Sequence, residues 1–142
     1  MPTVTITTPR PPLNLFEIVR IPLPDDGSWT TVYQVPQYSV PADGPTAPYT
    51  VDAAAIVSNL ILTSTTGSGI TADVRVTDAG GTDRMLTAGV SIAANSHVVL
   101  ALDKHILLTD ETLQVRLSAG ATGLAHFSFV LNQRERYTVI AP

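Results

Sequence analysis

Two adjoining segments near the C-terminal end alternate apolar and polar residues, and this alternation restricts the fold more than any other feature. An extended chain places every second side chain on the same face, so each segment is predicted to be a half-buried strand. The apolar positions are Leu113, Val115 and Leu117 in the first segment and Ala125, Phe127, Phe129 and Leu131 in the second. The small residues at 118–123 between them permit a reversal, which favours an antiparallel hairpin. Two strands cannot bury such faces alone, so the remaining chain must supply an opposing sheet.

Further strand-like segments occur from residue 29 onward, separated by turns rich in Gly, Asn and Ser. They cover residues 29–35, 54–64, 70–78, 82–88, 90–92, 97–102 and 106–108. A helical period of 3.6 residues is possible only at 13–20, where β-branched residues favour an extended chain. About eight strands at this spacing predict an all-β protein, an antiparallel β-sandwich of jelly-roll type, with a closed barrel as the alternative.

The alternation also predicts which side chains of these strands point inward. The inward set of residues 70–78 is Ile70, Ala72, Val74 and Val76, and Asp73 and Arg75 lie outward, within reach of Arg116 or Glu135. Residues 54–64 offer two faces, one with Ile56, Ser58, Leu60 and Leu62 and one with Ala55, Val57, Asn59 and Ile61. We also expect Trp29 and Tyr33 in the core, together with Met85 or Leu86.

The N-terminal part differs from the rest in its proline content, since ten of the 11 prolines precede residue 49. Proline lacks a backbone N–H, so Pro22 and Pro24 are expected to keep their segment out of a sheet. We therefore divide the chain into an arm at 1–28 and a β-sandwich domain at 29–142. The arm is too apolar for a solvated tail, so it is predicted to bind an adjacent copy or another protein. Its expected anchors are Val4, Ile6, Leu13, Leu15, Phe16 and Ile18. The alternative is that the arm folds back over its own sandwich.

Composition excludes several classes of partner. Charged residues make up only 14% of the chain, the net charge is −4 and Lys104 is the single lysine, which argues against nucleic-acid binding. No apolar run approaches the roughly 20 residues of a membrane span, so no membrane partner is expected. The absence of cysteine excludes disulfides and thiolate-bound metals.

No residue of the sequence is assigned a catalytic, cofactor-binding or metal-binding role. His97, His105 and His126 lack the close spacing of a histidine metal site, and Ser68 lies in a glycine turn without the elbow of a hydrolase nucleophile. The acidic residues beside turns form no ordered calcium loop; they are Asp78, Asp83, Asp110 and Glu111. We therefore expect a protein without enzymatic activity and without a cofactor.

A carbohydrate-binding role is kept as an alternative because sugars stack on exposed aromatic rings. Tyr38 and Tyr49 lie in the proline-rich loop 36–53 and are the candidate stacking residues. A sandwich that uses them would be a glycan-binding or host-adhesion module.

Five segments resemble small accessory β-sandwich proteins of tailed-bacteriophage virions. These segments are 31–36, 57–64, 72–81, 91–96 and 106–115, within a stretch that covers about residues 30–131. The resemblance implies a structural component of a virion, placed at the head surface as decoration, at the neck or at the tail. It implies synthesis in the host bacterial cytoplasm and partners that include copies of itself and the major capsid, portal, neck or tail proteins. It implies no catalytic residues.

Overall fold

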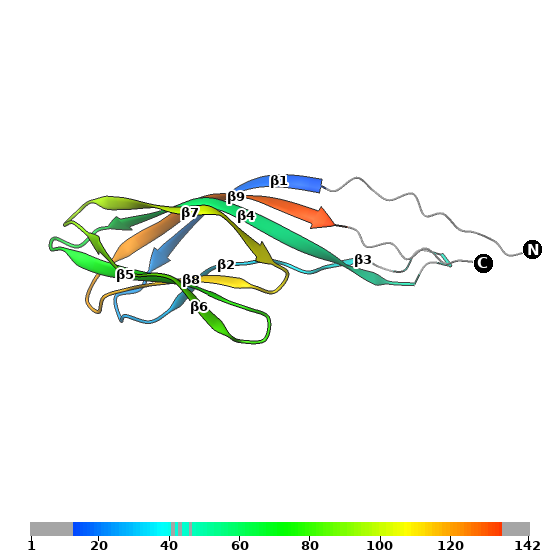
Figure 1. The fold of residues 1–142 in the computed structure, drawn as a ribbon, viewed down its shortest axis with the longest axis horizontal. Coiled ribbons are helices and arrows are strands. Elements are labelled where there is room, and N and C mark those ends of the chain that lie inside the picture. Colours follow the sequence, from blue (N-terminus) through cyan, green and yellow to red (C-terminus); the bar gives the residue numbers. More distant parts are fainter. Residues whose placement is uncertain (1–12, 41, 43, 46, 135–142) are drawn as a thin grey trace, which may run out of the picture.

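The computed structural model describes residues 13–40, 42, 44–45 and 47–134, which form nine strands and no helix. The strands are β1 (Leu13–Leu23), β2 (Thr30–Gln34), β3 (Tyr38–Val40), β4 (Tyr49–Ser64), β5 (Ile70–Thr77), β6 (Asp83–Ile92), β7 (His97–Leu108), β8 (Thr112–Leu117) and β9 (Gly123–Arg134). They make two layers that face each other, and the paired β3 and β4 extend away from the sandwich at one end (Figure 1). The all-β sandwich predicted from alternation is confirmed.

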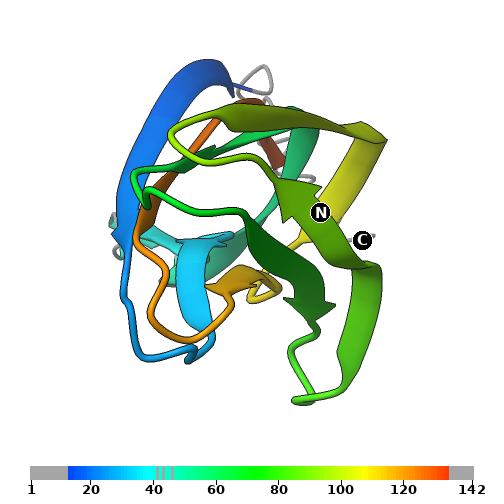
Figure 2. The same cartoon turned by 90° about the vertical axis from the view of Figure 1, so that its left-hand side faces the viewer.

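The strand order is that of a jelly roll. The first sheet has the order β1-β9-β4, with β7 and the short β3 also paired with β4, and the second sheet has the order β2-β8-β5-β6. Every strand pairing is antiparallel. Apart from β3, successive strands pass between the two sheets except at the β5–β6 hairpin, as in an eight-stranded jelly roll. Figure 2 shows the two layers end on.

The core lies between the layers and includes the inward residues that alternation predicted for β5, β8 and β9. Phe127 and Phe129 of β9 are each 1% exposed, and their ring centroids lie 5.7 Å apart. The inward residues of β5 and β8 are also buried; they are Ile70, Ala72, Val74, Val76, Leu113, Val115 and Leu117. Tyr33 packs on Phe129 with a centroid distance of 4.2 Å. Of the two candidates in β6, Leu86 packs against the core and Met85 is exposed.

The predicted hairpin of β8 and β9 is wrong. β8 pairs with β2 and β5, whereas β9 pairs with β1 and β4 in the opposite sheet. The connection therefore crosses from one layer to the other. Alternation shows that each strand has one buried face. It does not show whether two consecutive strands pair with each other in one sheet or lie in opposite sheets, because the pattern is the same in both cases.

The two faces proposed for β4 are each half right because the strand contains a bulge. Ala55 and Val57 are buried on one side of it, and Leu60 and Leu62 are buried on the other. The register with β9 shifts between Val57 and Leu60, so the extra residue reverses the parity of the strand.

The expectation that prolines keep residues 13–23 out of a sheet is wrong. β1 pairs with β9 along its whole length, from Leu13 opposite Gln133 to Leu23 opposite Gly123. β1 is an edge strand, where a proline is tolerated if its missing N–H faces away from the neighbouring strand. The boundary at residue 28 therefore does not separate this part of the arm from the sandwich. The candidate anchors Val4 and Ile6 lie outside the described residues.

Two pairs of predicted short strands are continuous. The segments 82–88 and 90–92 belong to β6, which bends at Gly89, where φ is 66°. The segments 97–102 and 106–108 belong to β7, whose register against β4 shifts between Val57 and Asn59. A bulge lets a strand continue through residues that break the alternation.

Candidate functional site

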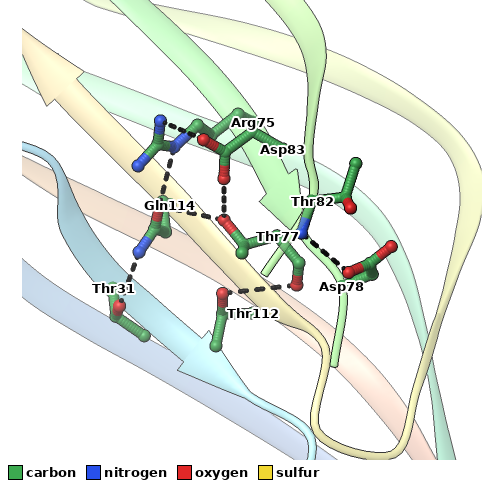
Figure 3. A network of polar contacts seen from close by, with 8 residues as sticks. All are labelled: Thr31, Arg75, Thr77, Asp78, Thr82, Asp83, Thr112 and Gln114. Carbon is green, nitrogen blue, oxygen red and sulfur yellow. Dashed lines mark hydrogen bonds and ion pairs between the residues drawn. The ribbon is translucent and has the colours of Figure 1, made fainter. Parts of the chain in front are cut away.

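The outer surface of the second sheet carries connected polar side chains, which we call the polar face. Its members are Trp29, Thr31, Asp73, Arg75, Thr77, Asp83, Gln114 and Arg116. Arg75 lies centrally in this network, with Nη1 2.9 Å from Asp83 Oδ2 and Nε donating to Gln114 Oε1 at 2.7 Å (Figure 3). Gln114 Nε2 in turn donates to Thr31 Oγ1 at 3.1 Å. The network thus joins β2, β8, β5 and β6 across the sheet.

Trp29 belongs to this polar face and not to the core, which corrects the prediction for it. The guanidinium carbons of Arg75 and Arg116 lie 4.1 and 4.6 Å from its ring centroid. Cations attract the face of an indole ring, so the two arginines hold the tryptophan on the outer surface. The bulge between Thr31 and Tyr33 changes the parity of β2, so the side chains before and after it no longer share one face.

Asp73 forms an ion pair with Arg116 and accepts a hydrogen bond from the bend in β6. Its Oδ1 accepts a hydrogen bond from the Gly89 backbone N–H, and its Oδ2 accepts one from Arg116 Nε, both at 2.7 Å. These two hydrogen bonds lower the pKa of Asp73 below its ordinary value of 3.8, and the bond from Gly89 has the larger effect. Asp73 is therefore ionised at neutral pH and engaged in structure, and it lacks the pKa near 7 that suits a general base.

Replacing Asp73 with asparagine tests this role. Asp73→Asn keeps an acceptor for Gly89 but removes the charge beside Arg116, so we expect the free energy of unfolding to fall by about 1 kcal/mol at pH 7. Because the pKa of Asp73 is lower in the folded than in the unfolded protein, its contribution exists above the unfolded pKa and is lost as pH falls through the folded pKa. Urea unfolding at pH 7 and below pH 3.8 should show the difference between variant and wild type shrink in acid.

Asp25→Asn is the control, because Asp25 is an exposed carboxylate outside the network. It is expected to change the free energy of unfolding by less than about 0.5 kcal/mol. If the difference in the free energy of unfolding between Asp73→Asn and wild type stayed constant from pH 7 into acid, the charge of Asp73 would not stabilise the fold through Arg116.

The outer surface of the first sheet carries six apolar side chains, which we call the apolar face. It comprises Ile18 of β1, Ile56 of β4, Val130 of β9, and Val99, Ile106 and Leu108 of β7. Ile106, Ile56 and Val130 lie directly opposite one another across β7, β4 and β9. Ile106 is 53% exposed and Leu108 is 57% exposed. Grouped exposed apolar side chains are typical of protein interaction surfaces.

Sequence reasoning did not find the apolar face, although a signal for it was present. Residues 106–108 are three consecutive apolar residues, and a strand covered on one face needs only every second residue to be apolar. Leu107 is buried, so Ile106 and Leu108 must face outward. Their strand lies beside Ile56 only because β7 pairs with β4, and this pairing is a tertiary feature.

Three of the four acidic residues considered for calcium, Asp78, Asp83 and Glu111, have structural partners for their carboxylates. Asp78 Oδ1 accepts hydrogen bonds from the backbone N–H groups of Gly80 and Thr82 in its own turn, each at 2.9 Å. Glu111 Oε2 accepts one from the Leu108 N–H at 2.9 Å, and its Oε1 lies 3.5 Å from Arg84 Nη2. The described residues contain no group of three or more His, Asp or Glu side chains placed to hold a metal ion.

The structure places the remaining predicted residues as follows. The histidines sit opposite different β4 residues: His97 opposite Thr63, His105 opposite Val57 and His126 opposite Ile61. Ser68 is exposed in the turn after β4.

Tyr38 and Tyr49 both belong to the β3–β4 pair, opposite Val51 and Val40 respectively, and glycan binding by them stays a prediction. The candidate anchors Leu13, Leu15, Phe16 and Ile18 lie in β1. No described residue lies in a helix that could cross a membrane.

Comparison with known proteins identifies no family for this chain. No family model and no curated protein matches the sequence. A protein of the disulfide-linked pili of Bacillus endospore appendages has a similar structure, with 14% identity, a TM-score of 0.48 and coverage of 92% of this chain and 96% of the other. Chains of infectious bursal disease virus are also similar. A chain from the Gx strain has 10% identity and a TM-score of 0.44. The similarity covers 94% of this protein and 37% of the viral chain. The VP2 subviral particle has 11% identity and a TM-score of 0.39.

Proposed function

We propose that this protein is a non-enzymatic structural subunit of a bacteriophage virion, located at the head surface as decoration or at the neck or tail. Its partners are further copies of the chain and neighbouring virion proteins, such as the major capsid, portal, neck or tail proteins. The observation that carries the proposal is the apolar face, in which a row crosses three strands and consists of the exposed Ile106 and Ile56 and the half-buried Val130. Such a face loses contact with water when it packs against a neighbouring protein.

The opposite sheet supports the same function. The charges of Arg75 and Arg116 are balanced by Asp83 and Asp73, at 2.9 and 2.7 Å. These ion pairs connect neighbouring strands of the second sheet. We call this sheet braced because its own polar side chains stabilise it. A rigid sandwich with one braced polar face and one apolar face suits a subunit that packs into an assembly.

The proposal predicts that the chain is a component of purified particles. Mass spectrometry of density-gradient-purified virions of the phage that encodes it is expected to detect the chain at a constant ratio to the major capsid protein. Its absence from purified particles would overturn the proposed function.

A substitution in the apolar face should reduce the amount on the particle. Ile106→Lys places a charge in this apolar row, and we expect at least roughly tenfold weaker retention, because burying an unpaired charge in an interface is costly. Met85→Lys is the matched control, since Met85 has the same 53% exposure but lies on β6 of the other sheet. Circular dichroism should show that both variants fold. Equal retention of the two variants would exclude the apolar face as the docking surface.

A further inference from the structure

Of the five described strands that border the two sheets, four are poorly suited to pairing with another chain. β3 has only three residues. β2 has five residues and a register shift between Thr31 and Tyr33. β6 has two register shifts against β5, and Gly89 in it has a positive φ angle. β7 has a register shift against β4 close to Asp103 and Lys104. Short strands, bulges and charges are the features that keep sheet edges from pairing with other chains.

β1 is different. Its 11 residues run opposite β9 without a register shift, from Leu13 to Leu23. No described strand pairs with its other edge. Among the described strands, β1 is therefore the one long and regular border whose backbone can accept a further strand.

Pro22 indicates which backbone groups of β1 lie on the open side. Proline has no N–H, so within a sheet it occupies positions whose N–H would point away from the neighbouring strand. Alternate residues of a strand point their N–H and C=O groups to the same side. Asn14, Phe16, Ile18 and Arg20 therefore direct their backbone N–H and C=O groups toward the open edge.

The side chains of β1 also leave apolar surface beside this edge. Ile18 is 58% exposed on the outer face of the sheet. Val19 and Ile21, which face the core, are only half-buried. A strand added along β1 would cover apolar side chains on both faces as well as pair the backbone.

We propose that β1 pairs antiparallel with β1 of a second copy of the chain, around a two-fold axis at Ile18. The best complement for a long regular edge is another such edge, and among the described strands only β1 provides one. Self-pairing of this kind is isologous and closes as a dimer. It joins the first sheets of two copies into one continuous sheet.

The register follows from length and charge. Any register centred on a residue of β1 brings the open backbone edges of the two copies together, but only the one centred on Ile18, the middle residue of Leu13–Leu23, pairs all 11 residues. Moving the axis to Glu17 or Val19 leaves two residues of each β1 unpaired, and the Glu17 register also sets two like charges directly opposite each other, which is destabilising. The Ile18 register sets Ile18 opposite Ile18 of the second copy, and Phe16 opposite its Arg20. The dimer therefore has an apolar contact on its axis.

Charge substitutions at Ile18 test both the contact and its symmetry. Sedimentation equilibrium of the full-length protein over a range of concentrations is expected to show a dimer. Ile18→Lys and Ile18→Glu should each raise the dimer dissociation constant by roughly tenfold or more, because two like charges then meet on the axis. A mixture of the two variants should recover a one-to-one dimer, because the introduced lysine of one variant then faces the introduced glutamate of the other. Ile18 is exposed, so both variants are expected to fold.

Met85→Lys, on the irregular border strand β6, is the control and should leave the dimer unchanged. A monomeric wild-type protein, an oligomer insensitive to both Ile18 substitutions, or no recovery on mixing would each overturn the pairing. The pairing names the copy-to-copy contact within the proposed assembly and rests on the proposed function only for its biological setting. A monomer that is present on virions would sink the pairing alone, whereas a dimer missing from virions would sink the proposed function alone.

Discussion

Replacing Phe129 with alanine is expected to lower the free energy of unfolding by about 3–5 kcal/mol. Phe129 is 1% exposed and lies between the two sheets, where its ring is 4.2 Å from that of Tyr33 and 5.7 Å from that of Phe127. Alanine would leave a cavity that these neighbours fill only in part, so the cost includes lost burial and lost contacts. Urea unfolding measured by tryptophan fluorescence and circular dichroism gives the difference directly.

Val130→Ala is the matched control for this substitution, because Val130 follows Phe129 on the same strand but faces the outer side of the sheet. It is half-buried, so we expect a cost of about 1 kcal/mol or less. If Phe129→Ala left the melting temperature unchanged, the assignment of the inward face of β9 would be wrong.

A methyl group at position 123 should be nearly as damaging. Gly123 begins β9 between Leu23 of β1 and Ser64 of β4. A Cβ atom there would overlap the backbone carbonyl oxygen of Thr63 and would lie 3.1 Å from Leu117 Cδ1. Because the obstacle is backbone in a paired strand, the strands must separate locally. We expect Gly123→Ala to lower the free energy of unfolding by about 3 kcal/mol, measured by thermal and urea unfolding.

Gly67→Ala isolates the steric effect from the general effect of replacing glycine. Gly67 lies in the turn between β4 and β5, and a Cβ atom there meets nothing within 4 Å. This control should be neutral or slightly stabilising, because alanine restricts the unfolded chain. Equal stabilities of the two variants would show that β9 does not approach β4 as closely as described.

Much of the core could be predicted from the sequence, because alternation depends on local geometry. The inward sets of β5, β8 and β9 follow from the two-residue period of an extended chain, and the buried residues agree with it at each predicted position, from Ile70 to Leu131. The outward position of Asp73 and its pairing with Arg116 also follow from this period together with an opposite charge on another strand.

The errors occurred where a tertiary contact outweighs the local pattern. Bulges in β2 and β4 change the parity of the strand, which moved Trp29 to the outer surface and divided the buried set of β4 between two predicted faces. The proline pattern of residues 13–23 predicted an arm, but an edge position tolerates Pro22 and the neighbouring β9 offers the pairing that β1 needs.

By itself, the sequence determined that this chain is an antiparallel all-β protein, favoured a sandwich over a closed barrel, and determined which residues of its most regular strands are buried. Period-two alternation shows that a strand has an inner face. Only the tertiary structure decided which strands are neighbours. It sent β8 and β9 to opposite sheets, placed Ile106 beside Ile56, and left β1 at a border. These pairings join residues far apart in the chain, and the free energy that selects them comes from packing two complete layers together, which no local segment encodes.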